Sequence, residues 1–118
     1  MIKSKIEIPI DKLTLYNKVV KGNPEIERKG KTTPYTSING HMFSFLSKNG
    51  TMGLRLSEND RINFIQYFDS QLLEQHGRVM KEYVTIPNDL LENTEQLSEY
   101  LQKSLDYVSC LKPKPTKK

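Results

Sequence analysis

The most informative part of this sequence is residues 33–56, which read TPYTSINGHMFSFLSKNGTMGLRL. Two Asn-Gly dipeptides, at residues 39–40 and 49–50, interrupt short segments rich in apolar and β-branched residues. Asn-Gly favours the left-handed backbone of a tight hairpin turn. Short strands joined by such turns pair with their neighbours, so residues 33–56 predict a three-stranded antiparallel meander.

A helix is predicted before the meander, over residues 10–21. Leu13, Tyr16 and Val20 recur there at the spacing of one helical face, and Gly22 follows as a stop signal.

A second helix is predicted after the meander, beginning at Ser57. We expect its apolar face to contain Ile62, Ile65 and Phe68, with Phe64 beside them, and expect it to end before the polar residues 74–77.

The rest of the chain predicts one more strand and one more helix. Residues 79–87 are rich in β-formers and end at a proline, which is typical of a strand. Residues 94–111 place an apolar stripe along a last helix, made of Leu97, Leu101, Leu105 and Val108.

The predicted fold class is therefore α+β. The expected order is helix, three strands, helix, strand, helix, in two layers: an antiparallel sheet of about four or five strands, with the helices packed on one face. With 118 residues the chain has the length of one domain. We assign residues 1–111 to that domain and residues 112–118 to a flexible basic tail.

Composition favours a cytoplasmic protein without a membrane partner. No apolar run approaches the roughly 18 residues of a membrane span, and the basic N-terminus is not followed by the apolar region of a secretory signal. The single cysteine, Cys110, has no internal disulfide partner.

Charge is unevenly distributed along the chain. Residues 1–57 carry ten basic and four acidic side chains, residues 58–111 carry four basic and ten acidic ones, and residues 112–118 add four lysines. The excess positive charge thus belongs to the tail. Such a tail is either a solubilising end or an arm that seeks phosphates.

No enzyme signature is present, and we predict neither a catalytic residue nor a metal or cofactor. His41 and His76 lack other ligands at metal-binding spacing, and Cys110 lacks a predicted activating histidine. The glycines are dispersed and form no phosphate-cradling loop.

The candidate contacts to a partner or to phosphate are basic residues and one tyrosine. Arg28, Lys29 and Lys31 lead into Tyr35, and lysines beside an aromatic residue can neutralise phosphates and stack a base. The alternative is a solvated entry to the strand. The tail contributes Lys112 and Lys114.

Arg55 is a separate candidate. It alternates with two leucines in a strand, so its side chain points away from theirs. Two roles are open to it: an ion pair with a carboxylate of the acidic half, or an anion contact at the surface.

The sequence resembles the TfoX N-terminal domain family over nearly its whole length from about residue 10. The resemblance lies in residues 27–31, 39–45 and 50–56, in the segment MKEYVTIP at residues 80–87, and in the closing helix with LKPKP at residues 111–115. It implies an α/β sandwich-like domain with an antiparallel sheet and no catalytic residues. In the competence regulators that name the family, this domain is joined to a second, C-terminal one.

We therefore predict a stand-alone, regulatory protein–protein interaction module with an unknown protein partner. A homodimer through exposed sheet edges is compatible with this prediction. The alternative is a nucleic-acid binder that uses the basic residues and the tail, which steep salt dependence would reveal. An enzyme acting on small metabolites would be favoured if Arg55, Tyr35 and Tyr83 converged on a closed cavity.

Overall fold

The computed structural model describes residues 9–30, 33–47, 50–75 and 77–111. Their order is α1 (Ile10–Lys21), β1 (Tyr35–Ile38), β2 (His41–Leu46), β3 (Met52–Arg55), α2 (Glu58–Phe68), β4 (Leu72–Gln75), β5 (Arg78–Thr85), α3 (Asn88–Glu92) and α4 (Thr94–Ser109).

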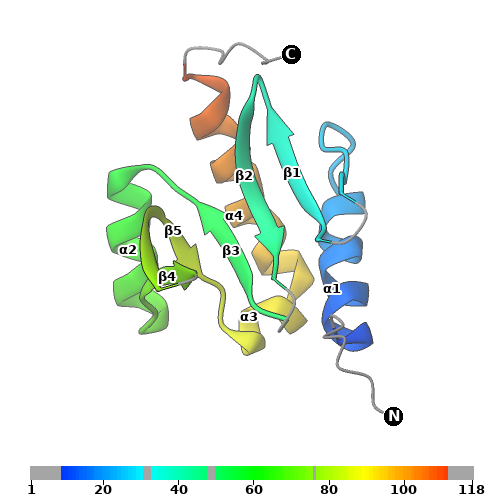
Figure 1. Ribbon diagram of the computed structural model, residues 1–118, viewed down its shortest axis with the longest axis horizontal. Coiled ribbons are helices and arrows are strands. Elements are labelled where there is room, and N and C mark those ends of the chain that lie inside the picture. Colours follow the sequence, from blue (N-terminus) through cyan, green and yellow to red (C-terminus); the bar gives the residue numbers. More distant parts are fainter. Residues whose placement is uncertain (1–8, 31–32, 48–49, 76, 112–118) are drawn as a thin grey trace.

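The predicted meander is confirmed. Strands β1, β2 and β3 pair antiparallel in that order, and the sheet continues through β5 to β4. Asn39 and Gly40 both have positive φ, 55° and 84°, as the tight turn between β1 and β2 requires. Figure 1 shows the two strands standing side by side at one end of the sheet.

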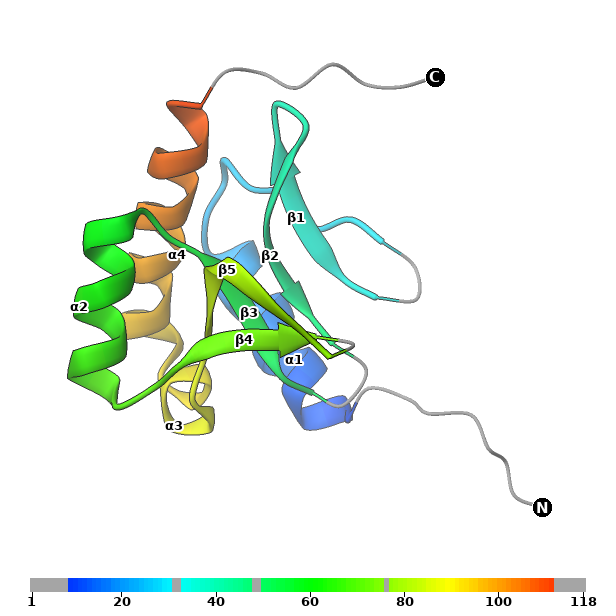
Figure 2. The same ribbon diagram turned by 60° about the vertical axis from the view of Figure 1, so that its left-hand side comes forward.

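The helices pack on one face of this sheet, which confirms the predicted α+β class and its two layers. Helix α4 lies against β1, β2 and β3 and also contacts α1 and α3, whereas α2 packs against β5. Figure 2 shows α2 and α4 together on one side of the strands. The opposite face of the sheet is called here the open face.

The core lies between the sheet and the helices. The stripe predicted for the last helix is confirmed, because its four residues are at most 4% exposed. No helix in the described part of the chain has the length and apolar character needed to cross a membrane.

Two details of the prediction are wrong. The expected order has no strand between the second helix and residues 79–87, but residues 72–75 form the strand β4. Helix α2 does end before residues 74–77, at Phe68, where Asp69 takes a left-handed conformation. Ile62 is 46% exposed, whereas Phe64 is 1% exposed and is the residue of α2 that enters the core. The two residues are about 200° apart around the helix, so both cannot face the sheet.

A bulge divides the side chains of β2 between the two faces. Thr36 pairs with Ser44 but Ser37 pairs with Met42, so Phe43 is an extra residue. Phe43 packs into the main core, and the hydroxyl of Ser44 lies 2.8 Å from that of Tyr16 on α1. Met42 and Phe45 consequently face the open side.

The hairpin β4–β5 covers part of the open face, and Gly53 of β3 makes this approach feasible. A Cβ atom at Gly53 would lie 2.7 Å from Cδ2 of Leu73 and 3.0 Å from the ring of Phe45. Leu73 and Phe45 are only 3% and 4% exposed, although both are outside the main core. The open face therefore has a small apolar cluster of its own.

Candidate binding site on the open face

The open face carries a pocket of about 350 Å³. Its lining is almost entirely apolar and comes from β1, β2, β5 and the approach to β1: Thr33, Tyr35, Met42, Phe45 and Met80. We call it the open-face pocket. A concave apolar site of this size accommodates one large side chain or a small apolar group.

The edge of the pocket at Tyr35 is fixed by backbone contacts. The N–H of Lys29 donates to the carbonyl of Tyr35 at 2.7 Å, and the N–H of Tyr35 donates to the carbonyl of Lys29 at 3.0 Å. Gly30 between them has φ 88°, and a Cβ there would lie 3.0 Å from Cδ1 of the Tyr35 ring. Glycine is needed here both for its conformation and for space.

The predicted proximity of basic residues and Tyr35 is therefore observed for Lys29, whose backbone bonds to that of Tyr35. The charge of Arg28, the residue before it, acts instead on the buried Tyr16 of α1. Both basic residues are exposed. Lys31, Lys112 and Lys114 lie outside the described residues.

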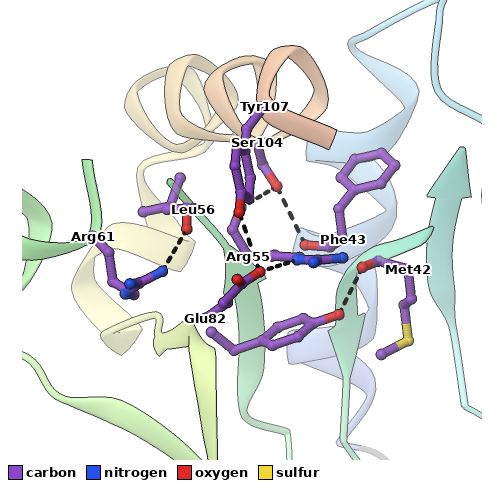
Figure 3. A network of polar contacts seen from close by, with 9 residues as sticks. Met42, Phe43, Arg55, Leu56, Arg61, Glu82, Ser104 and Tyr107 are labelled. Atoms are coloured by element: carbon purple, nitrogen blue, oxygen red, sulfur yellow. Dashed lines mark hydrogen bonds and ion pairs between the residues drawn. The ribbon is translucent and has the colours of Figure 1, made fainter. Parts of the chain in front are cut away.

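Arg55 forms an ion pair across the sheet. Its Nε donates to Oε1 of Glu82 at 2.6 Å, and its guanidinium carbon lies 5.7 Å from the centre of the Tyr107 ring. The Tyr107 hydroxyl donates to the same Glu82 oxygen at 3.3 Å. Figure 3 shows this network where β3 ends below α4. Of the two roles left open for Arg55, the structure shows an ion pair with the acidic half of the chain.

Ser104 of α4 fixes the backbone of this region. Its hydroxyl donates to the carbonyl of Arg55 and lies 3.4 Å from the carbonyl of Phe43. Arg61 donates to the next carbonyl, that of Leu56, at 2.9 Å. The end of β3 is thus tied to both α2 and α4 (Figure 3).

Tyr83 forms the wall between Arg55 and the open-face pocket. It is the cross-strand partner of Arg55, and its hydroxyl donates to the carbonyl of Met42 at 2.6 Å. Its ring lies 5.7 Å from that of Phe45, so it contacts two residues of the pocket lining. Burial raises the pKa of Tyr83 to about 12, partly offset by the charge of Arg55.

The three residues whose convergence would have favoured an enzyme are close together but do not enclose one cavity. Tyr35 lines the open-face pocket, whereas Arg55 lies behind the wall that Tyr83 forms. The lining residues Met42, Phe45 and Met80 were not predicted. The bulge in β2 decides which of them face the pocket, and the sequence pattern of alternating residues does not reveal it.

A second, more polar cleft of about 270 Å³ lies between α2 and α4. Its lining includes the aromatic rings of Phe64, Tyr67 and Tyr100, and the charged residues Asp60 and Lys103. Phe64 and Tyr100 stack edge to face, with centroids 5.2 Å apart. These rings stabilise the packing of α2 on α4.

Comparisons with known proteins assign no family, since neither the protein-family models nor the curated proteins give a match to this chain.

Proposed function

We propose that this chain is a non-enzymatic, TfoX-like regulatory module that binds an acidic segment of a protein partner on the open face of its sheet. The observation that carries the proposal is the open-face pocket, whose lining of Tyr35, Met42, Phe45 and Met80 is suited to an apolar anchor residue. Aromatic and methionine side chains are enriched in protein interfaces because they give large, adaptable contact areas.

The charges around the pocket support an acidic partner. Lys29 is exposed and is the antiparallel bridge partner of Tyr35, so the two side chains share a face. Arg78, two residues before Met80 on β5, is also exposed, and strand alternation places it on the face of Met80. Glu82, the acidic group nearest Tyr83, is already paired with Arg55. Positive groups on two sides of an apolar pocket favour a partner with carboxylates beside its anchor residue.

The polar groups next to the pocket are suited to binding rather than to acid–base chemistry. The hydroxyl of Tyr83 donates to a backbone carbonyl, and its pKa of about 12 keeps it protonated at neutral pH. On the helix side of the sheet, the hydroxyl of Ser44 is buried and bonded to two other hydroxyls, those of Tyr16 and Thr36. These contacts support the non-enzymatic assignment. The proposed compartment is the cytoplasm.

The test uses two neighbouring residues of β5 with side chains on opposite faces. Met80→Glu places a carboxylate in the pocket, and Val79→Glu adds the same charge at a position that is 57% exposed. The probe is a fluorescein-labelled peptide of alternating Glu and Leu, followed by anisotropy. We expect Met80→Glu to weaken binding at least about tenfold, because it buries an unpaired charge. Val79→Glu is expected to bind almost as the wild type.

Equal weakening by both substitutions would show that only net charge matters and would refute docking in the pocket. Absence of binding to the wild-type protein would also count against an acidic, apolar segment as the ligand. Analytical ultracentrifugation of the same samples shows whether the chain forms a homodimer and whether Met80→Glu disrupts it.

The second candidate function is nucleic-acid binding, favoured by the antiparallel contact between Lys29 and Tyr35. A basic and an aromatic residue so close can contact a phosphate and a base. Labelled single- and double-stranded DNA, titrated at two salt concentrations with the full chain and a 1–111 truncation, tests it. Salt-sensitive binding that survives truncation and is lost in a double Arg28→Gln, Lys29→Gln variant would favour this candidate.

A further inference from the structure

We infer that Arg55 is a carboxylate receptor, with a guanidinium that binds an acidic side chain of the protein segment seated in the open-face pocket. This inference rests on the proposed docking function. It adds the chemical group that is recognised beside the apolar anchor.

The terminal nitrogens of Arg55 are available. A guanidinium has five N–H donors in a planar fork, and the only one of these that bonds within the described residues is Nε–H, to Glu82 at 2.6 Å. The side chain is 20% exposed, so a ligand can reach part of it. A carboxylate can accept from both terminal nitrogens at once, which is the strongest hydrogen-bonding geometry open to them.

The guanidinium is also held in place before any ligand arrives. Glu82 fixes Nε, and the Tyr107 ring lies against the group at 5.7 Å. Tyr107 in turn donates to Glu82, and Ser104 donates to the backbone carbonyl of Arg55. Figure 3 shows these groups around the guanidinium. An arginine fixed in this way loses little conformational freedom on binding.

One side chain separates this arginine from the pocket. Tyr83 is the cross-strand neighbour of Arg55. Its hydroxyl donates to the backbone carbonyl of Met42, and Met42 also lines the pocket. Figure 3 shows the guanidinium pointing from the end of β3 toward Met42 and Phe43 of β2. A ligand anchored against Met42 therefore has its neighbouring group near Arg55.

The pairing of Arg55 with Glu82 favours a carboxylate over a phosphate. The oxygen of Glu82 lies 2.6 Å from Nε, so its charge already balances that of Arg55. The pair has no excess positive charge for the second charge of a phosphate monoester, whereas a carboxylate needs only the N–H donors of the guanidinium fork. The apolar pocket next to the arginine suits an amino acid side chain, so we commit to a protein ligand rather than to a nucleic acid.

The experiment compares N-acetyl-leucine with N-acetyl-leucinamide, which differ only in the carboxylate. Two signals of the isotope-labelled wild-type protein are followed by NMR: the Nε–H of Arg55 and the methyl group of Met42. N-acetyl-leucine is expected to shift both, with one saturation curve. The amide is expected to shift only the methyl group and to bind about tenfold more weakly, as loss of a charged hydrogen-bonded group predicts.

Substitutions distinguish the contribution of Arg55 to the affinity from that of the open-face pocket. Arg55→Gln should reduce the affinity for N-acetyl-leucine to that of the amide, and Arg55→Lys should be intermediate because lysine lacks the fork. Arg61→Gln, which removes a guanidinium bonded to a carbonyl outside the pocket, should bind as the wild type. Thermal unfolding of each variant confirms that it is folded.

The possible failures are distinguishable. Equal shifts by the acid and the amide, with the Met42 methyl responding to both, would overturn the carboxylate site and leave the docking proposal standing. Absence of any response at Met42 would contradict the docking proposal itself. A stronger shift of Arg55 by inorganic phosphate than by N-acetyl-leucine would also overturn the inference.

Discussion

Three buried hydroxyls connect α1 to the sheet at the level of single residues. The Tyr16 hydroxyl lies 2.8 Å from that of Ser44, which lies 2.6 Å from that of Thr36, and all three residues are fully buried. Each group needs its partner, because a buried polar atom without one is costly. The sequence predicts that Tyr16 faces the core, but a pattern of apolar positions does not indicate that polar residues of β1 and β2 meet it.

This network makes stability sensitive to alkaline pH. Burial raises the pKa of Tyr16 to about 12, partly offset by the hydrogen bonds of Ser44 and Thr36. An unfolded tyrosine loses its proton near pH 10, as is usual for a phenol. The unfolded state therefore binds fewer protons between pH 10 and 12, so stability is full below pH 10 and falls as the pH rises through 12.

We expect this loss to approach about 1.4 kcal/mol per pH unit for one such group. Urea unfolding of the wild type and of Tyr16→Phe, measured across pH 9–12, tests it: the variant should have the shallower slope. Tyr67→Phe removes an exposed phenol and should keep the wild-type slope. Parallel slopes for Tyr16→Phe and the wild type would contradict this role of Tyr16.

At the scale of elements, the hairpin β4–β5 gives the open face its shape. Leu72 pairs with Val84 but Leu73 pairs with Met80, so β5 bends as it passes from β3 to β4. The bend brings Leu73 over Gly53 and Met80 toward the pocket. Strand β4 has four residues and is followed by polar residues in the sequence. The sequence therefore predicts the end of a helix and a loop at this position, and not a strand.

Gly53→Val tests the close approach of the hairpin. A side chain at this position meets Leu73 and the Phe45 ring, so the substitution should destabilise the fold by about 1–3 kcal/mol, as overpacking does. It should also displace Phe45 and weaken ligand binding in the pocket. Chemical denaturation measures the first effect. Gly22→Ala, at a helix end where the nearest atoms are 3.5 Å from the added carbon, is the control.

Unchanged stability of Gly53→Val would show that the hairpin can move away at no cost. The apolar cluster on the open face would then not determine the position of β4.

For the whole molecule, local patterns determine the fold class but not the site. The two Asn-Gly dipeptides and the leucine stripe of α4 correctly predict the meander and the last helix, because each signal depends on neighbouring residues. Asn49 of the second dipeptide lies outside the described residues. Met42, Phe45 and Met80 come together through a bulge, a bend in β5 and the pairing of strands distant in sequence. These features depend on tertiary packing, which a single sequence pattern does not encode.

The distribution of charge along the sequence likewise does not reveal where the charges lie in the fold. The sequence separates a basic first half from an acidic second half, and Arg55 with Glu82 joins the two halves across the sheet. In the structure, exposed Lys29 from the first half is the backbone partner of Tyr35, and exposed Arg78 from the second half is two residues from Met80 on β5. That arrangement, rather than the net charge, supports an acidic protein partner.

The most direct test of docking on the open face is a methyl NMR titration of the full chain, labelled at methionine, with the peptide of alternating Glu and Leu. Met42 and Met80 line the pocket, whereas Met52 is fully buried in the core and serves as an internal reference. We predict saturable shifts of the Met42 and Met80 methyl groups at one affinity, with little change at Met52. Binding that leaves Met42 and Met80 unshifted would place the partner elsewhere and contradict the proposed function.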